Sequence, residues 1–180
     1  NFVAPLPMTL PTGESFVTAT ATDPAGNTSE FAAAITAMSA MADFGDAPES
    51  YGTSASNNGA YHILGGALWL GGMIDAEADG QPTASADGDD TNGVDDEDGV
   101  LFGGPLTAGM MAGLMVTASQ AGLLAGWFDF NRDGDWGDAG EQVFVNRSLT
   151  SGPNSLSFSV PATAVPGDSF ARFRFSTQGN

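Results

Sequence analysis

An alternation of apolar and polar residues, with a period of two, runs through the second half of the chain. It recurs, with Gly and Pro in between, over residues 114–119, 123–130, 142–149, 156–160 and 170–176. In the first of these segments Leu114, Val116 and Ala118 share one face. Period-2 strands at such short spacing are typical of antiparallel sheets that bury one face. The pattern therefore predicts an all-β fold, an antiparallel β-sandwich or jelly roll with long acidic loops.

Residues 1–37 are predicted to form a β-hairpin or a donor strand. Two β-rich stretches flank a strong turn signal, at residues 15–22, 23–27 and 28–36. The second stretch places Phe31, Ala33 and Ile35 on one face. Because an isolated hairpin is marginally stable in water, we expect this segment to need another element to pair with.

Residues 38–42 are predicted to connect this segment to a second domain over residues 43–180, although they also suit a short helix. The chain starts at Asn1 without Met, so we expect a mature or partial chain. Residues 99–128 carry no charge, but Pro, Thr and several Gly interrupt them, so we expect no membrane insertion.

The charges of the chain are strongly unbalanced. It holds 22 acidic residues against 4 Arg and no Lys, which gives a formal net charge of −18. Nucleic acids and anionic membranes bind basic surfaces, and the four Arg cannot build one, so neither is an expected partner. The absence of Cys excludes disulfides and thiolate zinc sites. Self-repulsion at this charge destabilises a compact fold unless a cation is bound.

One run of acids lies between residues 75 and 98, where no basic residue occurs and Gly recurs. Carboxylates on Gly-containing loops suit Ca²⁺, which takes about 6–8 oxygen ligands. The alternation at positions 75, 77 and 79 places three carboxylates on one side of an extended chain. The alternative is a solvated acidic loop. The candidate calcium ligands in this run are Asp75, Glu77, Asp79, Asp89, Asp90, Asp95, Asp96 and Asp98.

A second group of acids follows the pattern D-x-N-x-D-G at residues 129–134, the first half of an EF-hand-like calcium loop. The match then departs, because the twelfth position is Gly140 and the flanking residues alternate as strands do. We therefore predict a calcium loop in a β setting, with Mg²⁺ less suited because it prefers fewer protein ligands. The candidate ligands are Asp129, Asn131, Asp133, Asp135, Asp138 and Glu141.

Five further stretches occur in order along the second domain: DFGDAPESYGT (43–53), GAYHILGG (59–66), DAEADGQPTASADGDDTNGVDDEDGV (75–100), GWFDFNRDGDWGDAGEQVF (126–144) and ARFRFST (171–177). Together they resemble the GEVED domain of secreted and cell-surface bacterial proteins. The resemblance implies an extracellular, β-rich accessory module found beside adhesin-like and repeat domains, with no established catalytic activity. Upstream, TATDPAGNTSEF (20–31) resembles the closing strands of bacterial Ig-like or β-helix surface domains.

No enzymatic centre is predicted. His62 is the only His, and no G-x-S-x-G elbow accompanies it. A sugar-cleaving cleft is usually lined by aromatic residues, and the three Trp of this chain do not cluster in the sequence. Paired carboxylates for glycoside hydrolysis stay open as an alternative because acids abound.

The sequence thus favours a non-enzymatic structural module, secreted or displayed at a cell surface and stabilised by Ca²⁺. Residues 1–37 predict a homo-oligomer or polymer in which each subunit donates a strand to the next, giving an open filament. Two alternatives stay open: the hairpin belongs to a missing upstream domain, or the module binds glycans and serves adhesion. Asn27 and Asn146 begin N-x-S/T sequons, so glycosylation there is a further alternative.

Overall fold

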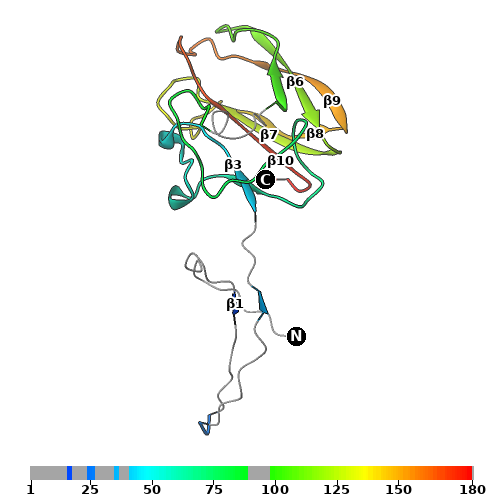
Figure 1. Ribbon diagram of the computed structural model, residues 1–180. Coiled ribbons are helices and arrows are strands. Elements are labelled where there is room, and N and C mark those ends of the chain that lie inside the picture. The colour runs from blue at the N-terminus through cyan, green and yellow to red at the C-terminus, as the bar shows by residue number, and fades with distance from the viewer. Residues whose placement is uncertain (1–15, 18–23, 27–34, 37–40, 89–97, 180) are drawn as a thin grey trace. The chain divides into compact units, whose positions relative to one another are not determined.

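A computed structural model of the protein describes residues 16–17, 24–26, 35–36, 41–88 and 98–179 (Figure 1). The chain divides into two compact units, residues 1–40 and residues 41–180. The predicted connector over 38–42 overlaps the second unit, because Ala42 is buried and already belongs to a strand.

The first unit contains a two-stranded antiparallel sheet. Strand β1 (Phe16–Val17) pairs with β2 (Ile35–Thr36), and Phe16 lies opposite Thr36. This register centres the pairing on Gly26, whose φ of +86° suits a tight turn. The predicted hairpin is therefore confirmed at these residues, while 18–23 and 27–34 lie outside the described residues.

Two three-stranded antiparallel sheets form the body of the second unit (Figure 1). Their orders are β10–β7–β8 and β5–β6–β9. The strands are β5 (Val100–Phe102), β6 (Met111–Ala118), β7 (Gly122–Phe128), β8 (Gln142–Leu149), β9 (Gly152–Ser159) and β10 (Ala171–Ser176). The two sheets enclose one core, so the predicted all-β sandwich is confirmed.

A smaller sheet and two short 3₁₀ helices precede this sandwich. Strand β3 (Ala42–Phe44) pairs with β4 (Tyr61–Ile63), and η1 (Glu49–Tyr51) and η2 (Ala55–Asn57) lie between them in sequence. None of the described helices is long and apolar enough to cross a membrane. The uncharged stretch 99–128 instead supplies β5, β6 and β7.

Inward-facing residues of both sheets form the core. Leu114, Val116 and Ala118 of β6 are buried, as their alternation predicts. Phe128 of β7 packs against Phe158 of β9, with ring centroids 4.5 Å apart. Burying a large apolar side chain stabilises the fold by about 1.5–3 kcal/mol. The remaining buried apolar members of this cluster are Leu124, Phe130, Phe144, Leu149, Leu156 and Val160.

The links between strands decide where the long acidic loop lies. Residues 119–121 and 150–151 are short crossings between the two sheets. Residues 129–141 instead join β7 to β8, which are neighbours in one sheet. The D-x-N-x-D-G segment therefore projects from one end of the sandwich as the loop of a wide hairpin.

Strand β9 begins earlier than the sequence predicts, at Gly152 instead of Leu156, in spite of Pro153. Pro153 lies opposite Thr117. The Thr117 N–H donates to the Gly99 carbonyl and the Thr117 carbonyl accepts from the Gly71 N–H, both on the other side of β6. The pair makes no hydrogen bonds across the β6–β9 ladder, so the N–H that Pro lacks is not needed there.

Candidate functional site

The loop over residues 129–141 curls through a series of side-chain to backbone hydrogen bonds. Asn131 Oδ1 accepts from the Asp133 N–H at 3.1 Å, and Asp133 Oδ1 accepts from the Asp135 N–H at 3.3 Å. Asp135 Oδ1 in turn accepts from the Gly137 N–H at 2.7 Å. Asp and Asn form such turns because their short side chains reach the amide two residues on. The alternating acids thereby fix the shape of the loop.

Asp129 is the buried anchor of this loop. It is 0 % exposed, although the alternation predicted over residues 123–130 puts Phe128 and Phe130 on one face and Asp129 on the opposite face. Its Oδ2 accepts from the Tyr51 hydroxyl at 2.6 Å and from the Gly134 N–H at 3.0 Å, and its Oδ1 accepts from the Arg132 N–H. Burial, and then the bond to Asp129, raise the pKa of Tyr51, so the phenol keeps its proton and donates.

Aromatic residues from distant segments brace the loop from one side. The Tyr51 ring lies 4.5 Å from the Trp136 ring and 5.4 Å from the Phe170 ring. Trp136 Nε1 donates to the Phe170 carbonyl at 3.2 Å, and the Arg172 guanidinium lies 4.4 Å above the Trp136 ring. No sequence pattern indicates the role of Tyr51, although it lies in the GEVED-like stretch 43–53. Only the fold shows that this stretch meets the loop.

Arg132 ties the loop to the segment before β10 through main-chain carbonyl groups. Its Nε donates to the Asp168 carbonyl at 2.7 Å and its Nη1 to the Pro166 carbonyl at 3.0 Å. Gly167 between them has a φ of +128° and leaves no room for a Cβ beside the guanidinium. These bonds direct the Arg132 charge toward backbone carbonyl groups.

Three of the predicted ligands meet at an exposed point on the loop. Asn131 Nδ2 donates to Asp133 Oδ2 at 2.9 Å and to Asp138 Oδ2 at 2.5 Å. All three side chains are exposed, and a hollow of about 330 Å³ beside them is lined in part by Asn131, Asp138 and Glu141. A half-turn of the Asn131 amide would present its oxygen in place of its NH₂ group.

Glu141 closes the base of the loop and is 3 % exposed. Its Oε1 accepts from the Phe130 N–H at 3.2 Å and its Oε2 from the Asp138 N–H at 3.1 Å. Burial raises its pKa most, and the charges of Asp129 and Asp138 raise it further, whereas the two backbone bonds lower it. Glu141 thus shares the electrostatic environment of the other acids of the loop.

These contacts divide the six predicted ligands of the loop into two groups. In the first group, the buried Asp129 and Glu141 accept hydrogen bonds from backbone amides, and the exposed Asp135 accepts from the Gly137 N–H. In the second group, Asn131, Asp133 and Asp138 converge at the surface. Among the residues that the structure describes, no three Asp, Glu, His or Cys side chains converge to form a metal site by themselves. A cation here would bind two carboxylates and the Asn131 amide oxygen, and would take its other ligands from water or backbone carbonyl groups.

The alternating acids at 75, 77 and 79 do not share one partner. Asp75 and Glu77 are in hydrogen-bond contact, and burial followed by this bond raises the pKa of Glu77 to about 7. Glu77 Oε2 also accepts from the Phe44 N–H at 2.8 Å. Asp79 Oδ1 instead accepts from the N–H of Ala55, the first residue of η2, at 2.6 Å. The structure thus brings two of these three predicted ligands together.

The rest of the first acidic run also lies partly in the described residues. Asp98 Oδ1 accepts from the Gly72 N–H at 2.9 Å, and Asp87 Oδ1 accepts from the Thr83 hydroxyl at 2.7 Å. The predicted ligands Asp89, Asp90, Asp95 and Asp96 lie outside the described residues, so their calcium role stays a prediction.

The chain from β7 onward carries the loop, its hairpin strands and the segment that Arg132 holds. Residues 123–180 match the family model of the GEVED domain. The GEVED match thus covers the whole 129–141 loop and strands β8 to β10, and it confirms the resemblance over that part of the chain. Tyr51 shows that the GEVED-like stretch 43–53 packs against the matched region. No curated protein and no solved structure significantly matches the chain.

Proposed function

We propose that the protein is a non-enzymatic structural module of an extracellular protein, stiffened by Ca²⁺ at the 129–141 loop of its GEVED-matched part. The observation that carries this proposal is the convergence of Asn131, Asp133 and Asp138 at one exposed point. Below that point lie two further acids, Asp129 and Glu141, that are already fixed by hydrogen bonds. Asp133 and Asp138 are therefore brought together before an ion binds, and the Asn131 amide has to turn to present its oxygen.

Electrostatics supports a cation at this place. The loop over residues 129–141 carries five acids against one Arg, and that guanidinium donates to carbonyl groups of the segment before β10. Each carboxylate raises the free energy of its neighbours in the absence of a counter-ion. A bound Ca²⁺ lowers this repulsion and replaces the Asn131–carboxylate hydrogen bonds with ion–oxygen contacts.

A thermal unfolding experiment tests this proposal. We expect Ca²⁺ to raise the melting temperature of the wild-type chain, since a ligand at one hundred times its Kd stabilises the folded state by about 2.7 kcal/mol. The double variant Asp133→Asn, Asp138→Asn should lose this response. Asp168→Asn removes one exposed charge outside the converging set and is the matched control that should keep it. Identical wild-type melting curves in Ca²⁺ and in chelator would reject structural calcium.

The glycan-binding alternative finds little support at the aromatic cluster around Trp136. Trp136 lies between the Tyr51 ring and the Arg172 guanidinium, so both partners cover part of the indole that a sugar ring needs. Trp69 and Trp127 are half-buried. We therefore rank a structural role above carbohydrate recognition.

We propose further that the module assembles through residues 1–37 into a homo-oligomer or filament. The described pairing of β1 with β2 covers two residue pairs, and a hairpin alone is marginally stable, so association with another sheet stabilises it. Deletion of residues 1–37 should leave a monomer in sedimentation and no filaments by electron microscopy. Filaments formed by the truncated chain would disprove assembly through this segment.

A further inference from the structure

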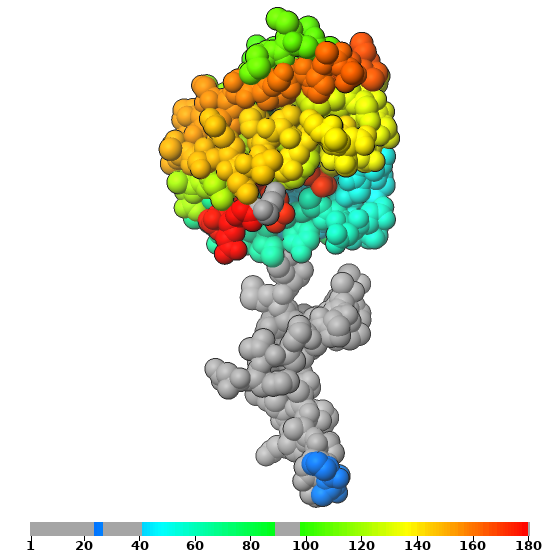
Figure 2. Space-filling model, turned by 180° about the vertical axis from the view of Figure 1, so that it is seen from behind, coloured from blue at the N-terminus to red at the C-terminus, as the bar shows by residue number. Residues whose placement is uncertain are grey.

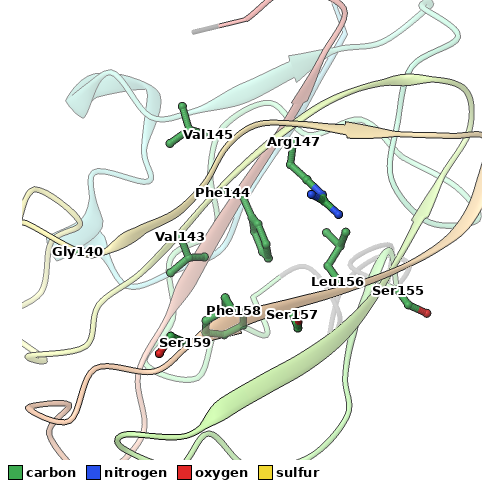
Figure 3. A pocket seen from close by; sticks show the side chains of 10 residues that line it. All are labelled: Gly140, Val143, Phe144, Val145, Arg147, Ser155, Leu156, Ser157, Phe158 and Ser159. Atoms are coloured by element: carbon green, nitrogen blue, oxygen red, sulfur yellow. The ribbon is translucent and has the colours of Figure 1, made fainter.

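The two sheets of the sandwich leave a hollow where β8 and β9 run along the same side. Each of these strands is the last in its sheet within the described residues. Figure 2 shows them side by side on one face of the second unit. The hollow between them measures about 550 Å³, and Phe144, Leu156 and Phe158 extend into it (Figure 3). Its apolar floor is therefore part of the sandwich core.

The outer edge of β9 presents a regular row of backbone groups. The backbone groups of the odd-numbered residues of β6 form their hydrogen bonds on the side of β5. The Gly113 carbonyl, for example, accepts from the Gly103 N–H, and the Thr117 N–H donates to the Gly99 carbonyl. Gly113 lies opposite Ser157 without exchanging hydrogen bonds, so the N–H and C=O of Ser157 point away from β6. The same alternation applies to Ser155 and Ser159. These three residues can thus extend the ladder by one more strand.

Strand β8 is less suited to accept a strand than β9. Its pairing with β7 shifts register between Leu124 and Gly126 and again before Trp127, and Asn146 has a φ of 50°. Such bulges bend an edge and interrupt its row of hydrogen-bonding groups. The ladder of β9 with β6 keeps one register over all eight residues. The acceptor edge is therefore β9.

The second strand of the N-terminal hairpin has the pattern that this edge requires. Phe31, Ala33 and Ile35 alternate along residues 28–36 and share one face. A strand added to β9 places alternate side chains beside Leu156 and Phe158, over the hollow. Within the described residues β2 pairs with β1 along one edge, so its other edge can pair with β9.

Charge favours β9 as the acceptor of the hairpin, and tether length favours the β9 of another copy. Residues 142–160 hold no acid and one Arg, Arg147, which lines the hollow, whereas residues 1–40 hold three acids and no base. In Figure 1 β3 and β9 lie at opposite ends of the second unit. Residues 37–41, which link the hairpin to β3, span at most about 18 Å when fully extended.

We propose that β9 of one copy is the acceptor edge for residues 28–36 of the next copy, with Phe31 and Ile35 entering the hollow between β8 and β9. This inference rests on the assembly proposed above and names its binding surface. Added head to tail, each hairpin extends the β5–β6–β9 sheet of a neighbour, and the contact does not close on itself.

Substitution at Ser157 of the full-length chain tests the acceptor edge. Ser157→Pro removes an N–H that points outward and leaves the β6–β9 ladder intact, so we expect at least a tenfold loss of assembly by sedimentation. Ser157→Ala keeps that N–H and should assemble as the wild type does. Circular dichroism and the melting temperature check that both variants fold.

Cysteine crosslinking gives a second readout that does not depend on proline. The chain has no Cys, so a disulfide in a mixture of two single-Cys variants reports contact between copies. We expect Ser157→Cys to crosslink with one member of the register scan Glu30→Cys, Ala32→Cys and Ala34→Cys. Ser148→Cys on β8 is the matched acceptor control and should not crosslink with any of them.

The outcomes separate this inference from the assembly proposal. If Phe31→Asp, Ile35→Asp abolishes assembly while Ser157→Pro assembles normally, or if crosslinks form only at residue 148, then β9 is not the acceptor. If the double Asp variant assembles as the wild type does, or the wild type never assembles, then strand donation fails and the acceptor assignment fails with it.

Discussion

At the scale of single residues, the acids of this chain act first as hydrogen-bond acceptors for its own backbone. Asp129, Glu141, Asp79 and Asp98 each accept from main-chain N–H groups, at positions where loops turn. The sequence shows the acids and their spacing, which led to the calcium prediction. It does not show that Asp129 is buried, because its partner Tyr51 lies 78 residues earlier in the chain.

The Tyr51–Asp129 bond gives a first prediction. Tyr51→Phe leaves a carboxylate oxygen of a fully buried Asp without its hydroxyl donor, so unfolding should become easier by about 1–3 kcal/mol. Urea unfolding measures this difference. Tyr61→Phe is the control, since the Tyr61 side chain is 60 % exposed, and it should change stability little. Equal effects of the two substitutions would contradict the anchoring role of Tyr51.

Glu77 gives a second prediction, on pH. Its pKa of about 7 in the folded chain lies above the ordinary value of 4.5, so the folded state binds the proton more tightly. This contribution is complete below pH 4.5 and is lost as the pH rises through 7, so the free energy of unfolding falls across that window. Urea unfolding at pH 5 and pH 7.5 in chelator measures the fall.

Two variants show whether this slope belongs to Glu77. Glu77→Gln should reduce the difference between the two pH values. Glu49→Gln should retain it, because hydrogen bonds from Ser54 and Asn57 lower the pKa of Glu49 and move its titration below the window. An unchanged slope in Glu77→Gln would show that another group titrates there.

At the scale of elements, period-2 alternation placed five of the six strands of the sandwich, and it missed β5, which lies in the uncharged stretch 99–128. Residues 142–149 are a strand over the same range that the alternation predicts, and β10 differs by one residue. The pattern failed where backbone geometry outweighs side-chain type. Pro153 lies inside β9 because its nitrogen faces the free edge, and the β8 bulge at Asn146 has no apolar or polar signal in the sequence.

The turn of the 129–141 loop gives a third prediction. Gly134 has a φ of +95°, and a Cβ there would lie 3.3 Å from Ser50 Oγ. Gly134→Ala should therefore destabilise the fold by about 1–2 kcal/mol, as measured by chemical unfolding. Gly45→Ala is the matched control, because its Cβ meets nothing within 4 Å. A loss no larger than that of the control would show that the loop tolerates another turn.

At the scale of the whole molecule, the formal charge of −18 is concentrated in loops. The two sheets of the sandwich contain few charged residues, and all the acids except Asp168 lie in the segments before β5 or between β7 and β8. Loops of this kind become ordered when their carboxylates bind backbone amides, cations or both. The first of these contributions is visible in the described residues, and the second is the central proposal.

Anomalous diffraction from crystals grown in calcium chloride tests that proposal most directly. We expect an anomalous peak at the point where Asn131, Asp133 and Asp138 converge, about 2.3–2.6 Å from their side-chain oxygens. The amide oxygen of Asn131 should face the ion. A well-ordered 129–141 loop without such a peak, in crystals that contain calcium, would contradict the proposed calcium site.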